Sequence, residues 1–189
     1  AQMVEVAPGK ILASIGQHAT FRSMVMFDVD WLYETERFND FADGLAQWTV
    51  FNYIKGITGH CSYNRIAGCE LVAHPEKEGK QVLHVQYKAD ESLVAATRGA
   101  VWNFPVMKQG SFKASVRIPQ GSEEVYLLLN DRWMNPCDTV ARHECMYEVK
   151  LDRKQLGIRD DKWHEITVSW DVEKKNAAAR IQVDGKKRN

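Results

Sequence analysis

The sequence predicts an all-β fold, a two-sheet antiparallel β-sandwich, on three observations. Apolar and polar residues alternate along several short segments, most regularly along residues 111–118, where Phe112 and every second residue to Ile118 are apolar. Turn signals separate such segments at intervals of roughly ten residues. No segment carries the extended 3.6-residue period of an amphipathic helix. Strands that are apolar on one face bury that face most simply as two sheets packed together.

The first 33 residues predict a separate strand segment, ahead of a sandwich that occupies residues 34–189. Residues 10–15 and 21–27 are two short strand candidates with a plausible turn between them. A two-stranded hairpin is marginal alone, so we expect it to join a larger sheet. Asp30 is expected to cap a short helical turn that follows it.

The sandwich is predicted to begin with four strands of mixed apolar and polar character. Glycine, proline and charged turn residues separate them. They are residues 48–51, 69–73, 81–87 and 99–104.

A strand, a long loop and a returning strand are predicted for residues 125–150. Residues 125–129 are apolar at every position, which is typical of a strand covered on both faces, and residues 146–150 alternate. About fifteen residues lie between them, and connections of that length without periodicity are often functional. This loop is therefore the first place to look for a binding site.

Two further strands are predicted at residues 163–170 and 178–183. Ile166, Val168 and Trp170 are expected on the inner face of the first. The Asp184–Gly185 pair is a strong hairpin signal, but only four residues follow it. We therefore expect a partner strand that this sequence lacks, in a domain that continues beyond residue 189.

Length and charge restrict the classes of partner. The chain has 189 residues, and its 25 lysines and arginines balance 25 aspartates and glutamates. Binding to nucleic acid or to an anionic membrane depends on neutralising phosphates with cations, so a zero net charge argues against both. No apolar run approaches the ~20 residues of a membrane span. We expect neither nucleic acid nor membrane as a partner.

The four cysteines form two evenly spaced pairs. Seven residues separate Cys61 from Cys69, and seven separate Cys137 from Cys145. Each pair flanks a polar, turn-rich loop, so two local disulfides are one prediction, and they would suit an extracellular or periplasmic protein. Partly buried thiols are the alternative.

Four motifs together resemble the concanavalin A-like lectin/glucanase superfamily, which includes laminin G-like modules. The resemblance spans about residues 38–189 and implies a jelly-roll form of the predicted sandwich. The motifs are D-x-x-D-G-L-x-x-W at 40–48, G-S-F-K-A-S-V-R at 110–117, W-H-E-I-T-V-S-W at 163–170 and R-I-Q-V-D-G at 180–185.

The first 33 residues are similar to a different family: they resemble the closing strands of a sialidase-like β-propeller. The similarity rests on G-K-I-L-A at 9–13 and M-V-M-F-D-V-D-W-L-Y at 24–33. It implies that the chain belongs to a larger bacterial glycoside hydrolase, with a neighbouring domain of the same polypeptide as a partner. No Asp-box motif, S-x-D-x-G-x-x-x-W, is present, and the catalytic residues of that family cannot be placed in this sequence.

These resemblances lead to an accessory carbohydrate-binding module as the first functional hypothesis. Sugar binding needs an aromatic surface for the apolar face of the ring and fixed polar groups for the hydroxyls. The long loop between the strands at 125–129 and 146–150 could supply both. Its candidate ligand-binding residues are Arg132, Trp133, Asp138, Arg142, His143 and Glu144.

A glycoside hydrolase and a purely structural or protein-binding sandwich are the two alternatives. Retaining hydrolases of this superfamily resemble E-x-D-x-E on one strand, and Glu144 and Glu148 have the spacing of the outer carboxylates. Met146 occupies the middle position of this pattern, where the hydrolases have an aspartate that tunes the pair of carboxylates. The third hypothesis is suggested by the many laminin G-like modules that are structural.

No cofactor is predicted, and zinc and a structural calcium ion are the two alternatives. Zinc could take cysteines with His60 or His143 as further ligands, but the chain has no C-x-x-C spacing. The superfamily resemblance allows a structural calcium ion between Asp131 and Asp138, although two acids seven residues apart are few ligands for one.

Overall fold

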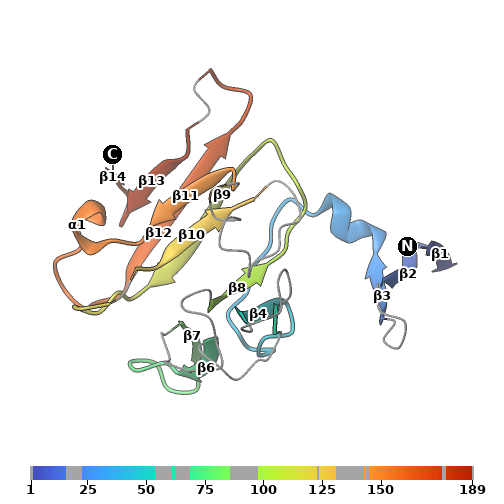
Figure 1. Ribbon diagram of the computed structural model, residues 1–189, viewed down its shortest axis with the longest axis horizontal. Helices are drawn as coiled ribbons and strands as arrows, with labels where there is room; N and C mark the ends of the chain where they lie inside the picture. The colour runs from blue at the N-terminus through green and yellow to red at the C-terminus, as the bar shows by residue number, and fades with distance from the viewer. Residues whose placement is uncertain are drawn as a thin grey trace. The chain divides into compact units, whose positions relative to one another are not determined.

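The computed structural model describes most of the chain, and it is all-β. The described residues are 2–15, 23–53, 61–62, 69–85, 98–122, 124–130, 143, 145–175 and 178–188. They form several antiparallel sheets, and no helix among them reaches seven residues (Figure 1). The predicted fold class is confirmed at this level. The chain divides into two compact units, Ala1–Asp40 with Asn103–Pro105, and Phe41–Trp102 with Val106–Asn189.

The first unit holds a three-stranded antiparallel sheet in the order β1-β2-β3. Its strands are β1 (Gln2–Ala7), β2 (Lys10–Ile15) and β3 (Ser23–Asp28). Strands β2 and β3 fall where the sequence predicts them, and β1 is the additional strand that a larger sheet requires. The short helical turn is a 3-10 helix, η1 (Val29–Tyr33), which begins before Asp30 and has no side-chain cap at Asp28. The expected capping role of Asp30 is therefore wrong.

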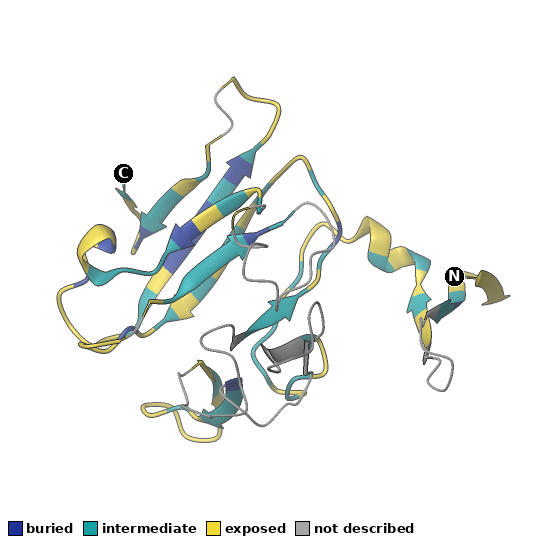
Figure 2. Ribbon diagram, viewed as in Figure 1, coloured by how far each residue is buried: buried dark blue, intermediate teal, exposed yellow. Residues whose placement is uncertain are grey.

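This small sheet buries little of its apolar surface. All of β1 is exposed, and Met3 is 71% and Met24 63% exposed. Ala13 is the one buried apolar residue among the described residues of the three strands. Figure 2 shows the same contrast, with buried residues gathered on the sheet of the second unit.

The second unit is built on a four-stranded antiparallel sheet in the order β14-β13-β12-β9. Along β9 the apolar side chains point to the inner face and the polar ones to the outer face, as their alternating burial shows. On β12 the inner-facing apolar residues are buried, and Thr167 of the outer face is buried as well. Ile166 and Val168 of β12 are fully buried and Trp170 is 8% exposed, which confirms their predicted orientation. The strands are β9 (Gln109–Val116), β12 (His164–Asp171), β13 (Arg180–Val183) and β14 (Lys186–Arg188).

The hairpin between β13 and β14 confirms one prediction and corrects another. Asp184 and Gly185 both have positive φ, at 51° and 73°, as a tight hairpin turn of this kind requires. The partner strand lies within the sequence, because Lys186–Arg188 pairs with β13. A wholly charged segment can still form an edge strand, since pairing uses the backbone.

A second layer covers the inner face of this sheet. It is the hairpin of β10 (Tyr126–Leu129) and β11 (Tyr147–Lys150). Val149 of β11 packs in one buried cluster with Ile166 and Val168 of β12, and Leu127 packs against the cluster. The core therefore lies between two antiparallel layers, which is the arrangement of a sandwich.

The remaining strands of the second unit form two smaller sheets. One has the order β5-β4-β8 and the other is the hairpin β6–β7. Trp48 of β4 stacks on Trp102 of β8 at 5.6 Å between ring centroids, and Trp102 meets Phe112 of β9 edge-on. The bounds are β4 (Trp48–Tyr53), β5 (Cys61–Ser62), β6 (Cys69–Ala73), β7 (Gln81–Val85) and β8 (Arg98–Trp102).

A single helical turn, α1 (Arg153–Leu156), joins β11 to the approach of β12. The Asp152 side chain accepts a hydrogen bond from the Gln155 backbone at 2.8 Å, a standard N-terminal cap. Gly157 ends the turn at φ 67°, a conformation that glycine adopts without strain. Leu156 is thereby directed into the core cluster.

Candidate functional site

The loop predicted to bind ligand lies almost entirely outside the described residues. Of its six candidates only His143 is described, and it is exposed. The register pairs Leu129 with Tyr147, so the strands hold the two ends of the loop next to each other. Arg132, Trp133, Asp138, Arg142 and Glu144 stay predictions.

The alternative catalytic pair is only half described. Glu148 lies exposed on β11, opposite Leu128 of β10 and on the face that points away from Val149. Glu144 falls outside the described residues. The proposed spacing of the two carboxylates across a sugar is therefore untested.

The cysteine predictions can be followed only at Cys69 and Cys145. Cys69 is a buried thiol, and burial, with a smaller effect of Glu70, raises its pKa to about 12. Such a thiol stays protonated and is a poor nucleophile. Cys145 is half-buried, Cys61 is described only as a residue of β5, and Cys137 lies outside the described residues, so the disulfide pairings stay predictions.

Metal ligands are likewise not gathered in the part of the chain that the structure describes. No group of three or more His, Cys, Asp or Glu side chains there could hold a metal ion. The zinc candidate His60 and the calcium candidates Asp131 and Asp138 fall outside that part.

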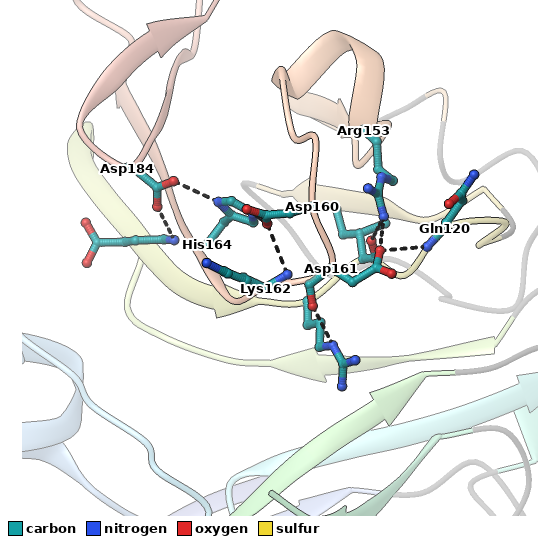
Figure 3. Close-up of polar contacts among 10 residues, drawn as sticks. Gln120, Arg153, Asp160, Asp161, Lys162, His164 and Asp184 are labelled. Atoms are coloured by element: carbon teal, nitrogen blue, oxygen red, sulfur yellow. Dashed lines mark hydrogen bonds and ion pairs between the residues drawn. The ribbon is translucent and has the colours of Figure 1, made fainter. Parts of the chain in front are cut away.

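Two polar regions of the four-stranded sheet remain, one at each end of β12. The first surrounds His164, where β12 begins (Figure 3). Its Nδ1 lies 2.7 Å from an Asp184 carboxylate oxygen and its Nε2 3.0 Å from Asp160. The hydrogen bond to Asp184, then that to Asp160, raises the pKa of His164. The hydrogen bond with His164 is the main reason why the pKa of Asp184 is lowered, whereas the pKa of Asp160 is lowered first by the Lys162 backbone N–H and then by His164.

Asp161 anchors a second set of contacts in the same region. Its side chain accepts hydrogen bonds from Arg153 and, at 3.1 Å, from the Gln120 backbone. Its carbonyl accepts one from the Arg117 Nε at 2.8 Å. Arg153 also donates to the Ile118 carbonyl at 2.9 Å. We call His164, Asp160, Asp161, Asp184 and Arg153 the polar clamp.

The polar clamp connects the start of β12 to the turns and the helix around it. Both ring nitrogens of His164 are engaged by carboxylates, so neither can accept a proton from a substrate. Asp184 also accepts from the Glu165 backbone at 3.0 Å, which fixes the β13–β14 turn to the start of β12. The clamp is a structural feature.

The second polar region is an open groove of about 520 Å³ at the opposite end of β12. This volume falls within the range of small-ligand sites. Residues of the three adjacent strands β9, β12 and β13 form it, together with the turn that follows β12 and the residues just before β13. Its lining includes Gln109, Ser111, Ser169, Asp171, Lys174, Lys175 and Arg180.

Strand register places polar groups in a row across this groove. Ser111 of β9 is directly opposite Ser169 of β12, and Ser169 is directly opposite Arg180 of β13. Two residue pairs further along, Gln109 is opposite Asp171. Side chains opposite each other on one sheet face lie about 4.5–5.5 Å apart at Cβ. The side chains of Ser111, Ser169 and Arg180 therefore leave the sheet next to one another.

The groove has an excess of positive charge. Lys174, Lys175 and Arg180 line it together with one carboxylate, that of Asp171. Lys174 forms an ion pair with Asp171 at 2.8 Å. The hydrogen bond from Lys174 is the main reason why the pKa of Asp171 is lowered, and the positive charge of Arg180 lowers this pKa further. Within the described part of the chain, no hydrogen bond or ion pair engages Lys175 or the Arg180 guanidinium.

A tryptophan on the inner face supports this end of the sheet. Trp170 donates from Nε1 to the Met107 carbonyl at 3.2 Å and lies against Gly110. A Cβ at position 110 would come within 2.5 Å of the Trp170 ring, so only glycine fits there without displacing the ring. The strands below the groove are therefore held in place by close packing.

The sequence alone did not indicate this groove as a site. Alternation identifies Ser111 as outward-facing, and the charged turn after Asp171 is recognisable. The pairing of β9 with β12 and of β12 with β13 is what brings these residues together.

Comparisons with known proteins supply no further assignment. No protein-family model matches the chain, and no curated protein matches it. In the described residues no helix is long and apolar enough to cross a membrane. The function must therefore be argued from the geometry of the groove.

Proposed function

We propose that this chain is a non-catalytic carbohydrate-binding module whose ligand lies in the groove over β9, β12 and β13. The observation that carries the proposal is the row of Ser111, Ser169 and Arg180 on adjacent strands. Sugar hydroxyls both donate and accept hydrogen bonds. Serine hydroxyls can do the same, whereas a guanidinium only donates. Groups fixed on strands are better preorganised for a ligand than groups on loops.

The structural context of the groove also suits binding without catalysis. A glycoside hydrolase needs a pair of carboxyl groups about 5–9.5 Å apart that flank the scissile bond. Asp171 is the one carboxylate among the described residues that line the groove, and Lys174 neutralises it. The resemblance of the sequence to concanavalin A-like and sialidase-like proteins supports an accessory role in a larger, extracellular or periplasmic glycan-degrading hydrolase.

A blocking substitution tests the proposal. Ser111→Tyr places a bulky side chain in the groove at an exposed strand position, where tyrosine is well tolerated. Ser115→Tyr is the matched control, since Ser115 lies on the same strand and face but outside the groove. Binding of a panel of neutral and acidic oligosaccharides is measured by isothermal titration calorimetry for the wild type and both variants.

We expect at least one oligosaccharide to bind the wild type and the Ser115→Tyr variant with equal affinity, and to lose at least ten-fold in affinity for Ser111→Tyr. Circular dichroism of both variants checks that the strands remain folded. If no oligosaccharide binds the wild type, or if Ser111→Tyr binds as well as Ser115→Tyr, the groove is not a carbohydrate site.

A further inference from the structure

We infer that the ligand of the groove is an acidic oligosaccharide, one that carries carboxylate or sulfate groups on its sugar rings. This inference rests on the proposed function, because it names the class of glycan that the same groove takes. It is carried by the cations that line the groove and by the absence of an exposed aromatic surface among the described residues that line it.

The cations are available to a ligand to different degrees. Lys174 is already paired with Asp171, so the protein itself satisfies much of its charge. Arg180 and Lys175 are exposed, and within the described part of the chain neither side chain donates a hydrogen bond. Among the described residues that line the groove, two positive charges therefore have no hydrogen-bonding partner. An arginine fork and a carboxylate or sulfate form two parallel hydrogen bonds, which gives both strength and orientation.

The position of Arg180 matches an anionic group attached to a sugar ring. Ser169 lies directly beside it on β12 and Ser111 beside Ser169 on β9. A pyranose whose charged substituent meets Arg180 would thus place its ring hydroxyls over the two serines. A simple anion without hydroxyls would use only the cationic side of the groove.

The lining also argues against a neutral sugar as the preferred ligand. Neutral sugars gain much of their affinity by stacking on an exposed aromatic ring. Trp170 is the one aromatic residue among the described residues that line the groove, and it is 8% exposed on the inner face of the sheet. Without stacking, charge-assisted hydrogen bonds are the strongest contacts that the groove can offer.

Pairs of oligosaccharides that differ only in charge test the inference. The first pair is β-1,4-linked mannotetraose and the β-1,4-linked tetramer of mannuronate, and the second is galactotetraose and tetragalacturonate. A sulfated galactan tetramer distinguishes sulfate from carboxylate, and tetraglutamate is the anion without a sugar. Affinities are measured by calorimetry at low salt, with the wild type, Arg180→Gln, Lys175→Gln and Lys113→Gln.

Lys113→Gln is the matched charge control. It removes one cation from the same outer face of the sheet, but Lys113 lies outside the groove and faces Glu165 at 3.8 Å. We expect at least one acidic tetramer to bind the wild type ten-fold or more tightly than its neutral partner. Arg180→Gln should abolish this preference, Lys175→Gln should reduce it, and Lys113→Gln should leave it unchanged.

The outcomes separate the inference from the proposed function. Equal binding of neutral and acidic partners overturns the inference and leaves carbohydrate binding intact. Tetraglutamate binding as tightly as the acidic tetramers overturns the inference too, because charge without sugar would then suffice. If nothing binds the wild type in either pair or in the wider panel, the proposed function itself fails.

Discussion

The two ends of the four-stranded sheet use the same kinds of side chain in opposite ways. Around His164 each charged group of the polar clamp meets a partner of opposite charge or a backbone group. At the groove, Lys174 has such a partner, while the side chains of Arg180 and Lys175 donate no hydrogen bond within the described residues. The two ends therefore differ in how far the protein itself satisfies their charges.

This contrast indicates which charges serve stability and which are available for binding. A charge that is already hydrogen-bonded inside the protein gains little from a ligand, because the ligand would only replace an existing partner. A solvated charge beside fixed hydroxyls can gain a new partner without breaking an old one. The polar clamp therefore explains how the sheet is held, and the groove is the better place to look for a ligand.

The largest expected effect concerns the packing below the groove. Replacing Trp170 with alanine removes a buried ring that fills the space against Gly110. We expect the free energy of unfolding to fall by about 3–5 kcal/mol, as for other buried aromatic residues. Urea denaturation followed by circular dichroism measures it. A loss below about 1 kcal/mol would show that the groove does not depend on the core beneath it.

A smaller effect, which depends on pH, is expected at the polar clamp. The raised pKa of His164 means that its contribution is complete below the unfolded-state value of about 6.5 and is lost as pH rises through the higher folded-state value. The lowered pKa values of Asp160 and Asp184 mean that theirs is present above about 4 and is lost as pH falls through the folded-state values. The clamp should stabilise most between about pH 4 and 6.5.

The measurement compares thermal unfolding of the wild type and His164→Gln from pH 3 to pH 9. Glutamine can still form hydrogen bonds but cannot carry the charge. The difference in melting temperature should therefore be greatest inside that window and should shrink on both sides. A difference that stays constant with pH would mean that His164 acts only as a neutral hydrogen-bonding group.

The sequence predicts the positions of single strands well, but it does not predict which strands pair with one another or in which register. Alternation over residues 111–118 and 163–170 depends only on which face of each strand meets the core, so a local pattern suffices. The register between β9 and β12 decides which residue lies opposite Ser169. This register joins distant parts of the chain, and no local pattern encodes it. Strand β1 was missed because its apolar residues lie on both faces, which removes the alternation.

The candidate site in the structure differs from the loop that the sequence predicts, and the reason is related. Sequence reasoning favoured the loop after β10, because length, charge and an aromatic residue can be read locally. The groove depends on three strands brought together by register, and serines and a single arginine on separate strands give no motif. The Asp184–Gly185 turn was recognised, but β14 was overlooked because three consecutive charged residues do not look like a strand.

The smallest expected effect is at the ion pair of Lys113 with Glu165, midway between the two ends. The pair is 3.8 Å long and both side chains are more than half exposed. Solvent screens such pairs, and they contribute about 0–1 kcal/mol. The double substitution of both residues to glutamine should therefore leave the urea midpoint close to that of the wild type. A marked loss would mean that the outer face of the sheet is stabilised by its charges throughout, and the distinction between its two ends would then lose its physical basis.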